Sequence, residues 1–236
     1  MNPLVVFGLV VLSTGAFGHA FHPIFNLAPN ATCDEEKFLS CATEFFQHLG
    51  FEEPPKSVME FALALDHLVQ TDGRDGYDKY CGWYRDYRKC GGDTVFPGCM
   101  TVPNLVHFGY PQADAYGFLQ LYDTEEYECM NARDVWYNNW DCIQMVDTKY
   151  RADFVACQEK LQQEMQQDLK HACKHLNDYV LCIQPPFTKE CGKEVGGFAC
   201  KDTWAGFKAI FPQCHHTCTL KNANFWQRLQ YAFRDN

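Results

Sequence analysis

Serine is scarce in this 236-residue sequence, and its scarcity argues against two kinds of function. After the first twenty residues only Ser40 and Ser57 remain, and neither precedes a glycine. The Ser-Gly pairs that accept glycosaminoglycan chains are therefore missing, which argues against a proteoglycan. The Gly-x-Ser-x-Gly turn that presents the nucleophile of many hydrolases is missing as well. Since no other catalytic motif is evident, we predict that the protein is not an enzyme.

Clusters of basic residues are also missing. The chain has 20 lysines and arginines against 30 acidic residues, which gives a formal net charge of −10. Nucleic acids and anionic membranes attract proteins that present clustered Lys and Arg, so we expect no nucleic-acid partner. The negative charge is compatible with a cationic partner, and it equally fits a simple role in solubility.

A long apolar run occurs only at the N-terminus. Residues 4–12 are almost entirely apolar, and small residues follow at Gly15, Ala16, Gly18 and Ala20. This pattern is typical of a signal peptide, which we predict over residues 1–20. The run is too short to span a bilayer, and residues 225–236 are amphipathic and charged. We therefore expect a secreted, extracellular protein without a membrane span.

Cysteine is abundant, in contrast to serine. The fourteen cysteines are Cys33, Cys41, Cys81, Cys90, Cys99, Cys129, Cys142, Cys157, Cys173, Cys182, Cys191, Cys200, Cys214 and Cys218. No Cys-x-x-Cys pair of the zinc-binding type is present, and the secretory route oxidises thiols. An even number of cysteines therefore predicts about seven disulfides. Asn30-Ala31-Thr32 is a glycosylation sequon, so we predict a glycan on Asn30.

The apolar residues recur at helical spacing through most of the chain. Thr32-x-x-Glu35 and Ser57-x-x-Glu60 resemble capping boxes, and an apolar stripe follows each of them. Gly50 and Pro54-Pro55 separate these two helices, and residues 71–76 predict a turn that ends the second. Further helices are predicted over 112–122, 133–146, 147–176, 203–211 and 224–233. Without an alternating strand, the fold class is all-α and disulfide-stapled.

The cysteine spacing contains an internal repeat. Eight residues separate Cys81, Cys90 and Cys99, and the same spacing recurs from Cys173 to Cys200. Tyr87 and Tyr179 both lie three residues before a middle cysteine. This predicts two related six-cysteine units, 41, 81, 90, 99, 129, 142 and 157, 173, 182, 191, 200, 214, with Cys33 and Cys218 left to link the ends. The units would occupy about 33–146 and 147–218 of a single domain over 21–236, followed by a helical tail at 219–236.

The predicted helix over 147–176 restricts the pairing of two cysteines. Cys157 and Cys173 would lie about 24 Å apart along this helix at the standard rise. Since a disulfide needs Cα atoms within about 7 Å, these two cysteines should not pair with each other.

Candidate metal ligands are few, and no cofactor is expected. His171 and His175 would lie one turn apart on the long helix, with Asp168 as a third ligand, but no His-Glu-x-x-His context supports them. Solvated histidines on a helix surface are the simpler interpretation. His215-His216 lies between two cysteines, where a disulfide loop explains it equally well.

Aromatic residues gather in two short segments. These are Trp83, Tyr84 and Tyr87, and Trp136, Tyr137 and Trp140. They could line a pocket for an apolar ligand, although packing between helices is the commoner role of such residues.

Three segments resemble a family of nematode secreted proteins with cysteine-rich domains, which are related to the chondroitin proteoglycan four domain. They are Tyr80-Cys81-x-Trp83-Tyr84 with Cys90, Tyr127-Glu128-Cys129 with Trp140-Asp141-Cys142, and Cys200-Lys201-Asp202-Thr203-Trp204 to Cys214. The resemblance implies a helical, disulfide-bonded extracellular protein and brings no catalytic residues.

Two functions remain open. The first is an extracellular, non-enzymatic interaction or structural protein whose partner is another extracellular protein. The alternative is a carrier of a small apolar ligand or lipid, held in a cavity between stapled helices.

Overall fold

The computed structural model describes residues 33–218, and every regular element in that range is a helix. This confirms the all-α fold class. None of the helices in this range is long and apolar enough to cross a membrane. The predicted signal peptide, the sequon at Asn30, the cap at Thr32, the helix over 224–233 and the tail at 219–236 lie outside the described residues.

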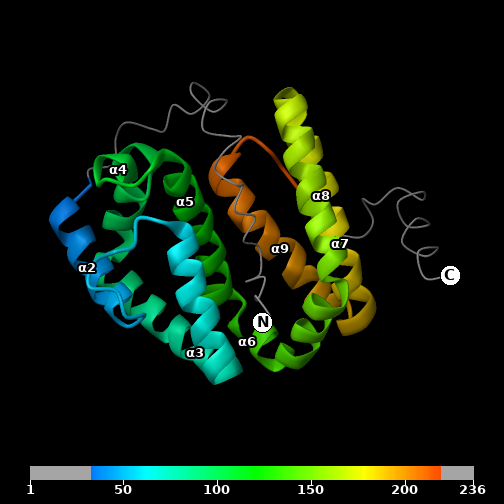
Figure 1. The fold of residues 1–236 in the computed structure, drawn as a ribbon, viewed down its shortest axis with the longest axis horizontal. Helices are drawn as coiled ribbons and strands as arrows, with labels where there is room; N and C mark the ends of the chain where they lie inside the picture. The colour runs from blue at the N-terminus through cyan, green and yellow to red at the C-terminus, as the bar shows by residue number, and fades with distance from the viewer. Residues whose placement is uncertain (1–32, 219–236) are drawn as a thin grey trace. The chain divides into compact units, whose positions relative to one another are not determined.

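The chain divides into two compact units (Figure 1), and the boundary lies between Arg133 and Asp134. We call the described parts the N-terminal unit (33–133) and the C-terminal unit (134–218). The sequence predicted this boundary near residue 146, which lies C-terminal to the observed one by about the length of one short helix. The difference matters because Cys142 then belongs to the second unit.

The N-terminal unit consists of four α-helices and one π-helical turn. They are α2 (Glu35–Gln47), α3 (Val58–Cys99), α4 (Val102–His107), α5 (Gln112–Glu126) and η1 (Tyr127–Asn131). Ser57 caps α3 as predicted, because its side chain accepts a hydrogen bond from the Met59 amide. Asp34 caps α2 by accepting from the Lys37 amide.

The helix α3 is interrupted twice by glycine. Gly73 has φ 60° and Gly92 has φ 68°, which are left-handed conformations that glycine adopts without steric cost. The predicted turn at 71–76 is therefore present as a break at Gly73. It does not end the element, because helical structure resumes and continues to Cys99.

The C-terminal unit consists mainly of three longer helices. Its elements are α6 (Arg133–Asn138), which begins at the boundary, α7 (Trp140–Gln167), the 3-10 turn η2 (Leu169–His171), α8 (Ala172–Cys191) and α9 (Lys193–Ile210). The helix predicted over 203–211 is the second half of α9. The helix predicted over 133–146 is divided at Asn139, which lies between α6 and α7.

The long helix predicted over 147–176 is wrong in its last third. Asp168 has φ −148° and ψ 70°, so α7 ends there and α8 starts four residues later. The Nε2 atom of His175 lies 3.1 Å from the carbonyl oxygen of Asp168. This contact satisfies a backbone group that the break leaves without a helical hydrogen bond. The apolar periodicity continues across Asp168 because α7 and α8 both contribute to one core.

Seven disulfides join the fourteen cysteines, and none is left free. The pairs are Cys33–Cys99, Cys41–Cys90, Cys81–Cys129, Cys142–Cys191, Cys157–Cys182, Cys173–Cys214 and Cys200–Cys218. Every bond lies within one unit. The predicted link between Cys33 and Cys218 is wrong, whereas Cys157 and Cys173 indeed have separate partners.

The two units share one order of pairing. In each, the first cysteine pairs with the fifth, the second with the fourth and the third with the sixth. The corrected sets are 33, 41, 81, 90, 99, 129 and 142, 157, 173, 182, 191, 214. The repeat in the sequence therefore corresponds to a repeated order of disulfide pairing. The sequence alone nevertheless assigned Cys33, Cys142 and Cys200 to the two six-cysteine sets incorrectly. Cys200–Cys218 is the additional bond of the C-terminal unit.

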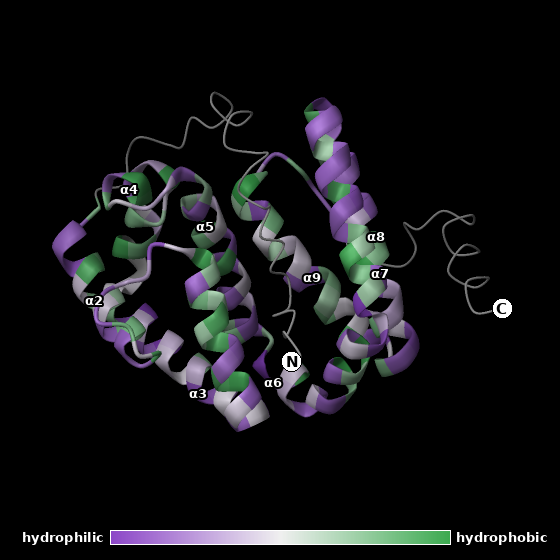
Figure 2. Cartoon of the chain, in the orientation of Figure 1, coloured by the Kyte–Doolittle hydropathy of each residue, from purple (hydrophilic) through white to green (hydrophobic). Residues whose placement is uncertain are grey.

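Aromatic residues at equivalent positions support the repeat. Phe38 and Phe154 precede the second cysteine of their units by three residues, and both are buried. Tyr87 and Tyr179 precede the fourth cysteine by three residues and are equally buried, at 8% exposure each. Figure 2 shows hydrophobic and hydrophilic residues interleaved along the helices, as expected for amphipathic helices that each bury one face.

We predict that one cut at the boundary separates the units without reduction. A specific protease site inserted between Arg133 and Asp134 should yield two fragments on a denaturing, non-reducing gel, because no disulfide crosses that point. The matched control places the same site between Glu52 and Glu53, inside the loops that Cys33–Cys99 and Cys41–Cys90 close. That cut should release no fragment until a reductant is added. Fragments that stay together after the boundary cut would show a bond between the units.

Two neighbouring glycines of α9 offer a second test. A Cβ on Gly196 would lie 1.9 Å from Thr188 Oγ1 and 2.9 Å from the Thr188 Cα, whereas one on Gly197 meets nothing within 4 Å. We expect Gly196→Ala to destabilise the protein by about 1–3 kcal/mol through overpacking of α9 against α8. Gly197→Ala should stabilise it by about 0.5–1 kcal/mol through helix propensity. Chemical denaturation of the disulfide-intact variants measures both effects, and equal stability of the two would contradict the close packing.

Candidate functional site: an aromatic cavity with a buried glutamate

The histidines proposed as metal ligands do not converge. His171 lies in η2 and is exposed, and its Nδ1 contacts Asp168 Oδ2 at 2.5 Å. His175 is buried at the start of α8, with Nδ1 3.4 Å from Glu164 Oε2. The break at Asp168 removes the one-turn spacing that a continuous helix would have given them. Both residues instead stabilise the turn between α7 and α8.

In the described range, one group of three potential ligands does converge: Cys200, His216 and Cys218. Its two sulfur atoms are bonded to each other, so neither is a thiolate that could bind a metal. His216 contacts Asn177 through Nδ1, and its ring lies 5.4 Å from that of Trp204. Burial lowers the pKa of His216 below its usual value. This is the disulfide loop that the sequence offered as the simpler interpretation.

The N-terminal unit contains a partly open cavity of about 50 Å³. Ten aromatic side chains line it: Phe38, Phe45, Phe46, Phe61, Tyr80, Tyr84, Tyr87, Tyr110, Phe118 and Tyr122. The remaining lining residues are Ala42, Met100, Leu105, Leu121 and Glu125. Glu125 is the single carboxyl in this lining, and no Lys, Arg or His belongs to it.

The aromatic rings pack against one another at typical distances. The Phe45 ring stacks on Tyr87 with centroids 4.9 Å apart, and the Tyr87 ring meets Phe96 edge-on at 4.5 Å. Such pairs contribute about 0.5–1.5 kcal/mol each beyond the area they bury. Cys41–Cys90 ties α2 to α3 beside these rings, so the wall of the cavity is cross-linked.

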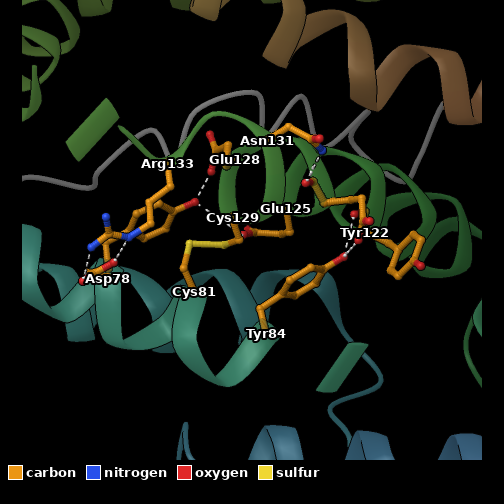
Figure 3. The surroundings of a disulfide bond; sticks show 11 residues. Asp78, Cys81, Tyr84, Tyr122, Glu125, Glu128, Cys129, Asn131 and Arg133 are labelled. Carbon is orange, nitrogen blue, oxygen red and sulfur yellow. Dashed lines mark hydrogen bonds and ion pairs between the residues drawn. A yellow bond between two sulfur atoms is a disulfide. The ribbon is translucent and has the colours of Figure 1, made fainter. Parts of the chain in front are cut away.

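Glu125 lies in the last turn of α5, four residues before Cys129. Cys129 is bonded to Cys81 of α3, so this face of α5 and η1 is held against α3 (Figure 3). The Tyr77 hydroxyl donates to Glu125 Oε2 at 3.4 Å and also to Glu128 Oε2. Glu125 and Glu128 are 2% and 1% exposed, so two carboxyl groups share a dry region beside one phenol.

Burial raises the pKa of Glu125 well above its ordinary value, and the neighbouring charge of Glu128 raises it further. Hydrogen bonding from Tyr80 and Tyr77 opposes this shift by smaller amounts. Burial likewise raises the pKa values of Tyr77 and Tyr80, and the charge of Glu125 adds to that effect. Glu125 is therefore held in its neutral form over a wider pH range than an exposed glutamate.

Ion pairs stabilise the rim of this region. Arg88 Nε lies 2.6 Å from Glu126 Oε2, and the Tyr84 hydroxyl donates to the Tyr122 carbonyl at 3.1 Å. Arg133 pairs with Asp78 through two hydrogen bonds of 2.6 and 2.7 Å, which fix the residues after η1 against α3 (Figure 3). The pairing with Arg133 lowers the pKa of Asp78.

The aromatic segments identified in the sequence have mixed roles. Tyr84 and Tyr87 line the cavity, whereas Trp83 stacks on His48 with centroids 4.8 Å apart. Trp136 is buried in the C-terminal unit and meets Tyr137 and Trp140 edge-on. The first segment therefore contributes to a cavity as well as to the core.

Sequence reasoning missed Glu125 and Glu128. A signal for Glu125 exists, because a residue four positions before a disulfide-bonded cysteine shares its helical face and should point inward. Glu126, between them, faces Arg88 instead. The run Glu125-Glu126-Tyr127-Glu128 otherwise resembles any solvated acidic stretch.

No protein-family model matches the chain, and neither a curated protein nor a solved structure shows a significant match.

The buried glutamate predicts a specific pH dependence of stability. A carboxyl whose pKa is raised on folding binds more protons in the native state than in the unfolded state. Its contribution is therefore complete below the unfolded pKa near 4.5 and is lost as pH rises towards the folded value. We expect Glu125→Gln to remove this loss, which can reach about 1.4 kcal/mol per pH unit.

Denaturation midpoints of wild type and Glu125→Gln between pH 4.5 and 8 measure this difference. The variant should gain stability relative to wild type as pH rises. Glu36→Gln removes an equivalent charge from the exposed surface of α2 and should show no such trend. Parallel pH profiles for wild type and Glu125→Gln would contradict a raised pKa of Glu125.

Proposed function

We propose that the protein is a secreted, extracellular interaction or structural protein without enzymatic activity. The observation that carries this proposal is that all fourteen cysteines form disulfides between or beside helices. A chain of this length can bury a core without such bonds, so their number fits a need to persist in an oxidising, unprotected environment.

The sequence supports the non-enzymatic part, because it contains no recognisable nucleophile, metal or cofactor motif. The predicted signal peptide over residues 1–20 and the sequon at Asn30 fit the same compartment. The similarity to nematode secreted cysteine-rich proteins is part of this proposal and rests on the cysteine and aromatic spacing alone.

The cavity is the observation that favours the alternative, a carrier of a small apolar ligand. The ten aromatic side chains of its lining suit an apolar molecule. Its volume of about 50 Å³, however, is far below the 300–1,000 Å³ of typical ligand pockets. A lipid would require the core of the N-terminal unit to open. We therefore rank the interaction or structural role first.

Secretion and oxidation state test the proposal together. The full-length chain expressed in a eukaryotic secretory system should appear in the medium. A thiol-alkylating reagent should add nothing to the denatured protein before reduction and fourteen groups after it. The Asn30→Gln variant should lack the mass of one glycan. Retention in the cytosol with free thiols would contradict the proposal.

The choice between the two roles needs the native protein. Organic extraction followed by mass spectrometry should recover no stoichiometric ligand if the interaction role is correct. Chemical cross-linking in the native extracellular material should then yield one reproducible neighbour. Repeated recovery of a single lipid would instead establish the carrier role.

A further inference from the structure

The carboxyl group of Glu125 has one oxygen without a partner. Oε2 accepts from Tyr77, whereas the buried Oε1 has no hydrogen-bond partner within 3.5 Å. An unsatisfied buried acceptor is destabilising, so such a group in a native core suggests a missing donor. Glu125 lines the aromatic cavity, so the donor can be supplied from that space.

The aromatic side chains that line the cavity favour a donor that carries a positive charge. The faces of aromatic rings carry partial negative charge and attract cations, most strongly where water is excluded. Phe45, Tyr80 and Tyr84 line the cavity together with Glu125, and no basic side chain belongs to its lining. A carboxyl that shares a cavity lining with several aromatic rings is a combination that suits an ammonium group.

The size of the cavity limits what can enter it. A cavity of about 150 Å³ binds benzene, so about 50 Å³ holds only two or three non-hydrogen atoms. Met100 and Tyr122 are the two lining residues that are partly exposed, and the other thirteen are buried. The rest of a ligand would therefore extend outwards past these two side chains, where the flexible thioether of Met100 can adjust.

We propose that this cavity binds the ammonium head group of a primary amine, with Glu125 as its counter-ion and hydrogen-bond acceptor. The amine is either a free alkylamine or the side chain of a lysine on a partner protein, since both present the same group on the same kind of apolar stem. This site goes beyond the proposed extracellular role and does not rest on it.

Binding should release a proton. Glu125 is neutral in the free protein over a wider pH range than an exposed glutamate, because burial and the charge of Glu128 raise its pKa by more than hydrogen bonding from Tyr80 and Tyr77 lowers it. An ammonium ion pairs with the charged carboxylate, so the glutamate proton leaves to solvent as the cation enters. The affinity for the amine should therefore rise with pH until Glu125 is ionised in the free protein.

Calorimetric titration of the full chain with n-butylammonium chloride tests the site, with 1-butanol as the neutral analogue of similar size. We expect saturable binding of n-butylammonium and no saturable binding of 1-butanol. Glu125→Gln should weaken n-butylammonium binding at least tenfold. Glu36→Gln, which removes a charge from the exposed surface of α2, should weaken it less than twofold.

Proton release in the unmodified protein provides a test that needs no variant. Titrations at several pH values between 4.5 and 8, each in two buffers of different ionisation enthalpy, should show release of up to one proton per n-butylammonium bound. Absence of binding at 50 mM n-butylammonium, equal binding of 1-butanol, unchanged binding in a folded Glu125→Gln variant, or binding without proton release would each overturn the proposal.

The source of the amine is decided by a second pair of probes. These are Nα-acetyl-lysine methylamide and its uncharged analogue Nα-acetyl-norleucine methylamide. If the lysine compound binds at least as tightly as n-butylammonium and the norleucine compound does not bind, the group comes from a partner's lysine. If n-butylammonium alone binds, the ligand is a free amine.

Discussion

The antiparallel pairing of two helices by two disulfides is the constraint on which both units depend. Cys41–Cys90 joins α2 to the last part of α3. Cys33–Cys99 joins the residue two positions before α2 to the last residue of α3. Cys157–Cys182 and Cys142–Cys191 join α7 to α8 in the same order. Each such pair fixes helix direction and register, so the aromatic residues between the cysteines must face a common core.

Much of the fold follows from local sequence signals. The all-α class, the cap at Ser57 and the separation of Cys157 from Cys173 all depend on helical periodicity and short-range chemistry. The break at Asp168 was not predictable in this way, because apolar spacing continues across it while the backbone turns. The division at Arg133 was also hidden, since it depends on which cysteine Cys142 pairs with across 49 residues.

The candidate site depends on contacts between distant segments. The sequence drew attention to Tyr84 and Tyr87 through their local density, but not to the carboxyl group that they accompany. The environment of Glu125 is created by Tyr77 and Tyr80 from α3, nearly fifty residues earlier in the chain. Helical periodicity indicates that Glu125 points inward, and only the three-dimensional arrangement shows that it meets an aromatic cavity.

The nested order of the disulfides changes the effective loop that each bond closes. Cys33 and Cys99 are 66 residues apart, but 49 of these are already enclosed by Cys41–Cys90, which leaves 17. In the C-terminal unit, the 49 residues between Cys142 and Cys191 shrink to 24 once Cys157–Cys182 has closed its 25. Because closure entropy grows with loop length, the inner bond makes the outer one easier to form. In each helix pair the inner disulfide can thus form first and the outer disulfide after it.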